Sequence, residues 1–294
     1  MKGFNFIVLI AFYAIFFQGC NNDWEDLSKT KEIPENGILE SINFSEVYVN
    51  PYDYVGKYHN DGLNYVFENY YKRPMMKSLS EEAKDDILRN LIFEYCTENP
   101  IVDGFKNDSS IIFEKVITKS HDNKIFINEK QQQFFEQVWS LYRNQVASSP
   151  QDFITRINKI EANISISELT EIEKVQLLVS TAVAKFSACF WMDQMLLKNQ
   201  TTTLKTRSTE ADWLDWFRDV FMPKAEKVLE ADFAGAAAGA VEGLVFGGAV
   251  GSIVPGAGTI TVAITGAVTD GAKGAIVNST LEGIGVNWKF WTWF

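Results

Sequence analysis

His59 is the residue whose type could do acid–base chemistry in this chain, because only two histidines occur among its 294 residues. It lies in the segment Gly-Lys-Tyr-His-Asn-Asp-Gly, followed directly by Asn60 and Asp61. Three consecutive residues on a helix point in different directions, so these three need partners from elsewhere to act together. We favour a buried, hydrogen-bonded His59–Asn60 pair that locks helix packing over a catalytic or metal-binding role. The other histidine, His121, is expected to be solvated.

Other reactive residues are few and form no catalytic pattern. The chain has no G-x-S-x-G, phosphate-binding loop, H-E-x-x-H or dinucleotide-binding sequence. Cys96 and Cys189 lie in apolar helical patterns without metal-ligand spacing, which favours two small buried hydrophobes over a mutual disulfide. We therefore expect no catalytic residue, metal or cofactor, and a protein that is not an enzyme.

Cys20 is the residue expected to be modified. Met1 and Lys2 begin a short basic region, an apolar run follows to Phe17, and a small glycine precedes Cys20. This order is typical of a secretory signal. A cysteine directly after the cleavage point resembles a bacterial lipobox, which implies that Cys20 is the lipidated first residue of the mature chain. The alternative is an ordinary cleaved signal with an incidental cysteine.

The glycine pattern near the C-terminus predicts how two helices touch. Five glycines recur every fourth residue in the first arm, at Gly235, Gly239, Gly243, Gly247 and Gly251. The second arm, Thr259 to about Asn278, carries small residues at the same spacing, among them Gly266, Gly271 and Gly274. Each glycine inside a helix lowers its stability by about 0.8–1.0 kcal/mol relative to alanine. The pattern is sensible only if close backbone approach offsets that loss, so we predict an antiparallel glycine-zipper hairpin.

Three locations remain open for this hairpin. The stretch Phe233–Val254 is long enough to span a bilayer and contains one charge, Glu242, but the second arm contains Asp270 and Lys273. Charges near the bilayer centre disfavour insertion. Packing within the body is therefore favoured over membrane insertion and over self-assembly. Four of the last five residues are aromatic, and this tail either folds back or contacts a membrane.

The rest of the chain has the apolar spacing of helices. These are expected at about 52–71, from a capping box at Ser78 and Glu81 to about Tyr95, at 129–146, from Ser149 and Pro150 onward, at 167–198, and from Ser208 past Pro223 into the hairpin. The fold class predicted is all-α, a multi-helix bundle with a C-terminal glycine-zipper hairpin. The segments predicted are a signal peptide at 1–19, a lipid-anchored tether at 20–50, a helical body at 51–198, a linker at 199–208, and the last helix, hairpin and aromatic tail at 209–294.

Charge limits the partners. The formal net charge of −11 repels phosphate backbones, so no nucleic-acid partner is expected. The partners expected are a membrane, through the lipid on Cys20, and a helix of another protein or of a second copy.

Three segments resemble a family of uncharacterised Bacteroidetes lipoproteins. They are Gly56-x-x-His59-Asn60-x-x-Leu63, then Glu173-Lys-x-x-Leu-Leu with Ala184-Lys-x-Ser187-x-x-x-Trp191, and Glu230-Ala-Asp232-Phe-Ala-Gly235-Ala. The resemblance implies an exported α-helical protein of the cell envelope, an outer-membrane lipoprotein. The acidic residues after Cys20 resemble a surface-export signal, which leaves the cell surface and the inner leaflet both open.

The functional hypothesis is a non-enzymatic envelope or surface lipoprotein whose hairpin makes helix–helix or membrane contact. Two alternatives remain. One is a secreted membrane-active antagonist of the bacteriocin-like or pore-forming kind, and the other is an enzyme that uses His59.

Overall fold

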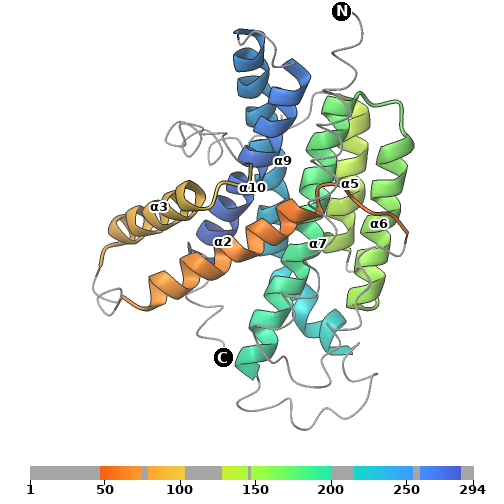
Figure 1. The fold of residues 1–294 in the computed structure, drawn as a ribbon. Coiled ribbons are helices and arrows are strands. Elements are labelled where there is room, and N and C mark those ends of the chain that lie inside the picture. Colours follow the sequence, from red (N-terminus) through yellow and green to blue (C-terminus); the bar gives the residue numbers. More distant parts are fainter. Residues whose placement is uncertain are drawn as a thin grey trace, which may run out of the picture. The chain divides into compact units, whose positions relative to one another are not determined.

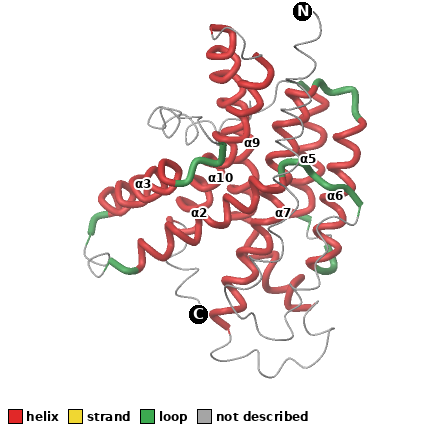
Figure 2. Tube along the Cα trace, in the orientation of Figure 1, coloured by secondary structure: helices red, strands yellow, loops and turns green. Residues whose placement is uncertain are grey.

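The structure is a computed structural model that describes residues 47–73, 79–102, 128–144, 147–199, 215–253 and 259–285. All of them belong to one compact unit, Ile42–Phe294. Within the described residues the chain is helical and has no strand (Figure 2), which confirms the all-α multi-helix fold. The helices are α2 (Asp53–Tyr71), α3 (Glu81–Glu98), α5 (Glu129–Arg143), α6 (Pro150–Ile166), α7 (Glu171–Asn199), the π-helix η5 (Phe217–Phe221), α9 (Met222–Ile253) and α10 (Thr259–Gly285).

Helices α9 and α10 form the predicted hairpin and pack along one another (Figure 1). Helix α7 packs against both of them, and α2 lies against α7 and α10. Helix α3 packs on α2 and α10, while α5 and α6 cover α7. The hairpin therefore belongs to the same unit as the helical body, although the sequence suggested two segments. Its second arm is also longer than predicted, reaching Gly285 rather than about Asn278.

Helix α7 is the central core helix that its composition predicted. Its residues from Val175 to Met195 are almost all buried, on every side of the helix. Its start is fixed by a capping box, in which the Thr170 backbone N–H donates to Glu173 Oε2 at 2.7 Å while the Glu173 N–H donates to Thr170 Oγ1. A helix that is apolar on most of its surface needs neighbours all round it, and α2, α6, α9 and α10 supply them.

Local sequence signals place the other helix starts with one correction. Ser149 caps α6 through the Asp152 N–H, with Pro150 in the first turn, as predicted. The capping box expected from Ser78 to Glu81 is wrong by two residues. Helix α3 begins at Glu81, and Ser80 accepts the Ala83 N–H at 3.3 Å, because an N-cap hydroxyl bonds the N–H three residues ahead.

The chain enters α9 through a π-helical turn. Residues Phe217–Phe221 form η5, and the Met222 N–H bonds to the carbonyl of Phe217 five residues earlier. Pro223, which has no N–H to donate, follows at once. A wider turn just before a proline relieves the clash of its ring with the preceding turn, so the helix continues past it as predicted.

Several predictions concern residues outside the described ranges. They are the signal peptide and Cys20, most of the tether, the segment with His121, the linker after Asn199, and the aromatic tail. The tether was given an end at residue 50, but Asn50 is buried and hydrogen-bonded within the body.

Candidate functional site

The glycines of the hairpin lie where the backbones of α9 and α10 meet. A Cβ added at Gly239 would overlap the backbone of Asp270, and one at Gly243 would overlap the backbone of Gly266. Gly247 has the same relation to Val262. Side chains at these positions would push the two helices apart. The glycine stripe therefore forms a contact within the chain.

The glycines of the second arm, α10, also lie at close helix contacts. Gly266 and Gly274 face the backbones of Gly243 and Gly235 on α9. Gly271 lies between α7 and α9, because a Cβ there would lie 2.7 Å from Val179 Cγ1 and 3.2 Å from the Ala236 carbonyl oxygen. For Gly251, the structure gives its place in α9 and nothing of its contacts.

Helix α2 uses glycines in the same way, a feature that sequence reasoning missed. A Cβ at Gly56 would lie 2.6 Å from the Ala182 carbonyl oxygen of α7, and one at Gly62 would lie 2.5 Å from Ile276 Cδ1 of α10. The available signal was a glycine placed inside an amphipathic helix, which lowers helix stability unless another element approaches closely.

His59 of α2 is fully buried. Its Nδ1 lies 3.1 Å from Asn60 Oδ1, and Asn60 Nδ2 donates to the Phe186 carbonyl of α7 at 2.9 Å. Because the Asn60 amide group donates to Phe186, its oxygen is left to accept the Nδ1 proton, and His59 Nε2 carries the lone pair of a neutral ring. The buried, hydrogen-bonded His59–Asn60 pair favoured from the sequence is therefore present, although consecutive helical residues were expected to point in different directions.

Asp232 of α9 lies close to His59 of α2 and to two side chains of α7. Its Oδ1 lies 3.9 Å from His59 Nε2, and its Oδ2 accepts hydrogen bonds from Trp191 Nε1 at 3.0 Å and from Ser187 Oγ. All four side chains are buried. Three segments far apart in the sequence, which contain His59, Ser187 with Trp191, and Asp232, thus meet at one buried cluster contributed by α2, α7 and α9.

Burial sets the protonation of this cluster. It raises the pKa of Asp232 to about 7, against the opposing effect of the hydrogen bonds from Ser187 and Trp191. It lowers the pKa of His59 to about 4, against the hydrogen bond to Asn60. A protonated Asp232 could direct its O–H toward His59 Nε2, and neither Asp232 Oδ1 nor Nε2 has another hydrogen-bond partner among the described residues.

The cluster contains the residue types of a serine–histidine–aspartate triad in a different order. A triad needs the serine hydroxyl bonded to the histidine, which abstracts its proton. Here Ser187 bonds to Asp232, and His59 faces the other oxygen of the same carboxyl group. The arrangement ties three helices to one carboxyl group and does not activate the hydroxyl.

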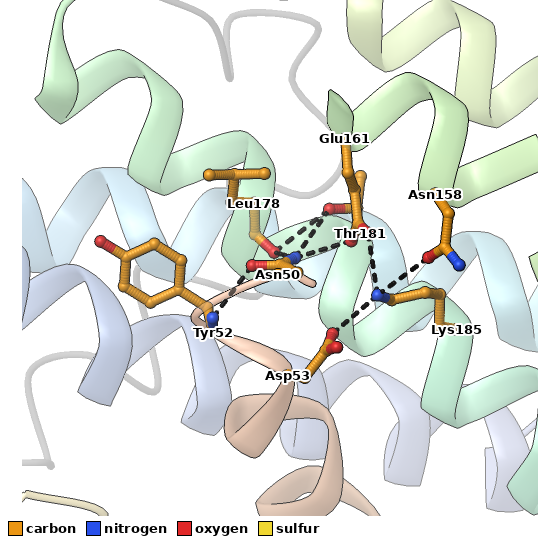
Figure 3. Close-up of polar contacts among 8 residues, drawn as sticks. All are labelled: Asn50, Tyr52, Asp53, Asn158, Glu161, Leu178, Thr181 and Lys185. Atoms are coloured by element: carbon orange, nitrogen blue, oxygen red, sulfur yellow. Dashed lines mark hydrogen bonds and ion pairs between the residues drawn. The ribbon is translucent and has the colours of Figure 1, made fainter. Parts of the chain in front are cut away.

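A second buried polar cluster surrounds Lys185 of α7 (Figure 3). Its Nζ lies 2.8 Å from Glu161 Oε2 of α6 and 2.7 Å from Asp53 Oδ1 at the start of α2. Asn50 Nδ2 donates to Glu161 Oε1 at 2.6 Å. Burial raises the pKa of Glu161 to about 7 in spite of Lys185, and it raises the pKa of Asp53 as well.

The cysteines and acidic residues give no sign of metal or disulfide chemistry in the described part of the chain. Cys96 and Cys189 are free thiols, so the alternative of a mutual disulfide is wrong. Burial raises the pKa of Cys96 to about 11, which keeps it protonated at neutral pH. Among the described residues no group of three or more histidine, cysteine, aspartate or glutamate side chains is placed to hold a metal ion.

The far end of the hairpin differs from the rest of it. Val245, Phe246 and Ile260 are 67%, 47% and 59% exposed, whereas the apolar residues nearer Asp232 are buried. No charged residue occurs from Gly243 to Thr269. Exposed large apolar side chains near one end of a helical hairpin make that end a candidate contact surface.

Two described helices are long and apolar enough to cross a membrane by length and composition. They comprise Glu171–Met195 within α7 and Thr259–Gly283 within α10, with 94% and 72% of their most apolar windows buried inside the protein. A buried core helix passes the same test, and α7 is one, so this result carries little weight by itself.

Comparison of the chain with models of protein families, with curated proteins and with solved structures finds no match.

Proposed function

We propose that this protein is an exported bacterial lipoprotein that acts by contact and not by catalysis, with Cys20 as its lipid anchor and the end of the α9–α10 hairpin as its contact surface. The observation that carries the proposal is the exposed group Val245, Phe246 and Ile260 in a stretch without charges. We call these three residues the hairpin end.

The distribution of burial along the hairpin supports contact at the end and not along the zipper. Gly239, Gly243 and Gly266 face the partner arm, and Gly271 lies between α7 and α9. A second protein could reach that stripe only by displacing a helix that already fills it. The hairpin end is therefore the part of the hairpin that a partner could contact without unfolding the protein.

The anchor rests on the N-terminal sequence. A basic start with Lys2, an apolar run to Phe17 and a small residue before Cys20 support export and lipid attachment. A single acyl chain gives only marginal membrane binding, so a second contact would strengthen attachment. The hairpin end is suited to supply it.

Cell fractionation tests the proposal. Cells that produce the natural chain or the Cys20→Ala variant are separated into membrane and soluble fractions, and intact cells are treated with protease to establish sidedness. The natural chain is expected in the outer-membrane fraction, and Cys20→Ala should shift to the soluble fraction or remain unprocessed. If both chains are cytoplasmic and keep residues 1–19, the proposal is wrong.

A secreted membrane-active antagonist is a second candidate, because the same exposed apolar end would suit it. The two candidates differ in what happens to a target bilayer. An antagonist should release dye from liposomes at some combination of pH and lipid composition, whereas an anchored contact protein should bind without leakage.

A further inference from the structure

We infer that residues 47–53 form a latch, which fastens the start of the folded chain to α6 and α7 through Asn50 and Asp53 and whose closure weakens as pH rises to neutrality. In the sequence the residues before the latch lead back to Cys20. The inference rests on the buried cluster around Lys185 and not on the lipid anchor, so it goes beyond the proposed function and is tested apart from it.

Asn50 joins the latch to both helices. Its side chain is 2% exposed. The Nδ2 group donates to Glu161 Oε1 of α6 at 2.6 Å and to the Leu178 carbonyl oxygen of α7 at 2.7 Å. The Oδ1 atom accepts the Tyr52 N–H at 2.9 Å, which fixes the turn into α2 (Figure 3). One side chain therefore bonds a buried carboxyl group, a helix carbonyl and its own turn.

The residues just before Asn50 add little apolar contact. Val47 and Val49 are 44% and 67% exposed, and Tyr48 between them is half-buried with its hydroxyl close to Ser165 of α6. Among the described residues, fully buried apolar contact begins only at Val55 in the first turn of α2. The attachment of the latch therefore depends mainly on polar contacts, which water can replace when the segment lifts.

The cluster beneath the latch has more negative than positive charge. Lys185 Nζ lies 2.7 Å from Asp53 Oδ1 and 2.8 Å from Glu161 Oε2. When both carboxyl groups are ionised, two negative charges face one positive charge in a buried place. Burial favours a proton retained by the carboxyl pair, which removes the excess charge. Other titratable groups also act on the cluster or on the residues that cover it: Lys57 of α2, Tyr48 of the latch and Glu171 of α7.

This proton couples the latch to pH. Burial raises the pKa of Glu161 to about 7 in the closed latch, and it raises the pKa of Asp53 as well. Opening lets water reach both groups, and the pKa of an exposed carboxyl group is about 4. The closed latch therefore holds a proton that the open latch releases between about pH 4 and 7. Closure is strongest below this range and weakens as pH rises through it.

Opening changes the reach of the tether. A released residue spans about 3.3–3.6 Å, so residues 47–52 add up to about 20 Å of chain. In a chain anchored at Cys20, the folded body can then lie that much farther from the membrane. Only this consequence rests on the proposed function.

Hydrogen exchange of the purified full chain between about pH 5 and 8 tests the latch. The probe is the amide of Asp53, which donates to the Asn50 carbonyl at 3.1 Å. Amides of α7 near Ala182 serve as the reference for global unfolding. Protection factors compare the observed rate with the intrinsic rate, which removes the direct effect of pH on exchange. Protection at residue 53 should be lower than near Ala182 and should fall by up to tenfold for each pH unit to about pH 7.

Three variants separate the contact from the charge. Asp53→Asn keeps an oxygen for Lys185 and removes the excess negative charge, so protection at residue 53 should no longer change with pH. Asp152→Asn is the matched control, because Asp152 lies in the first turn of α6 and pairs with Arg156, and it should leave the pH dependence intact. Asn50→Ala should lower protection at residue 53 at least about tenfold at pH 5, because three hydrogen bonds are lost. Circular dichroism verifies that each variant is folded.

Any of three results would overturn the inference. Protection at residue 53 that does not change with pH in the natural chain removes the coupling, and this measurement needs no substitution. Protection equal to that near Ala182 at every pH means that the segment opens only when the protein unfolds. Unchanged protection in Asn50→Ala means that Asn50 does not hold the segment. A chain with the expected exchange that is cytoplasmic and unprocessed keeps the latch and refutes only the proposed function.

Discussion

At the scale of single residues, the core of this protein is notable for its ionisable groups. His59, Asp232, Lys185 and Glu161 are all fully buried, and each meets partners from other helices. Burying such groups is unfavourable unless they are paired or neutral. The shifted pKa values follow from this, and they make stability depend on pH.

Replacing Asp232 with asparagine should remove one pH dependence. The pKa of Asp232 is raised to about 7 in the folded state, from about 3.9 in an unfolded chain. Between these values the folded state binds more protons, so the carboxyl group lowers the free energy of unfolding as pH rises. The stability of Asp232→Asn relative to the natural chain should therefore improve by a few kcal/mol between about pH 4 and 7.

Urea unfolding at a series of pH values measures this difference. His59 works in the opposite direction between pH 4 and 6.5, because its folded-state pKa is lowered, and it is present in both chains. A difference in stability that does not change with pH would contradict the protonation assigned to Asp232.

Replacing Lys185 with methionine should be strongly destabilising near pH 7. The change leaves Glu161 and Asp53 buried without their cation, and losing one partner of a buried ion pair destabilises by about 3–5 kcal/mol. The loss should shrink toward acid pH, because both carboxyl groups have raised pKa values and become neutral there.

Lys174→Met on the same helix is the matched control for Lys185→Met. Among the described residues Lys174 forms an ion pair with the exposed Glu171, and such pairs contribute about 0–1 kcal/mol. Thermal or chemical unfolding measures the loss of stability in both variants, and the loss should be larger for Lys185→Met. Equal effects would show that the buried ion pairs of Lys185 contribute no more than the pair of Lys174 with an exposed carboxylate.

At the scale of elements, the hairpin depends on where its glycines lie and not on glycine content as such. Gly243 and Gly248 occupy the same helix, but only Gly243 faces a backbone. A Cβ at Gly243 would overlap Gly266, whereas one at Gly248 would meet nothing closer than Ala263 Cβ at 4.0 Å. The same substitution should therefore have opposite effects at the two positions.

Gly243→Ala should destabilise the protein, and Gly248→Ala should stabilise it. Overpacking a tight contact typically lowers stability by about 1–3 kcal/mol, whereas alanine improves a helix by about 0.8–1.0 kcal/mol over glycine. The free energy of unfolding of both variants is the measurement. Stabilisation by both substitutions would mean that α9 and α10 are not in backbone contact at Gly243.

At the scale of the whole molecule, the hairpin and the helical body should unfold together. The Asp232 cluster joins α9 to α7 and α2, and Gly62 of α2 sits against Ile276 of α10. A two-arm hairpin tied to the core in this way cannot open at its base without breaking the core.

Hydrogen exchange under native conditions can measure this cooperativity. Amides of α7 near Ala182 and of α9 near Ala236 should exchange only through global unfolding, with equal opening free energies. Amides near Phe246, at the exposed hairpin end, should exchange faster in the absence of membranes. A smaller opening free energy near Ala236 than near Ala182 would show that the hairpin opens independently.

Helix positions, most caps and the hairpin could be predicted from the sequence because they depend on short-range patterns. Apolar spacing marked the helices, Ser149 and Pro150 marked the start of α6, and the glycine spacing marked a close helix pair. The exposed apolar end of the hairpin could be read only in part, since the sequence shows that charges are absent but not that Phe246 is uncovered.

The sequence by itself determined the helices, the period of the zipper and the candidate anchor at Cys20, which lies outside the described residues. Only the tertiary structure decided that His59 faces Asp232 and that Lys185 lies between Glu161 and Asp53. The physical reason is that periodicity shows which side of a helix is buried but not which helix covers it. The partner of a buried polar group is fixed when helices far apart in the chain pack together.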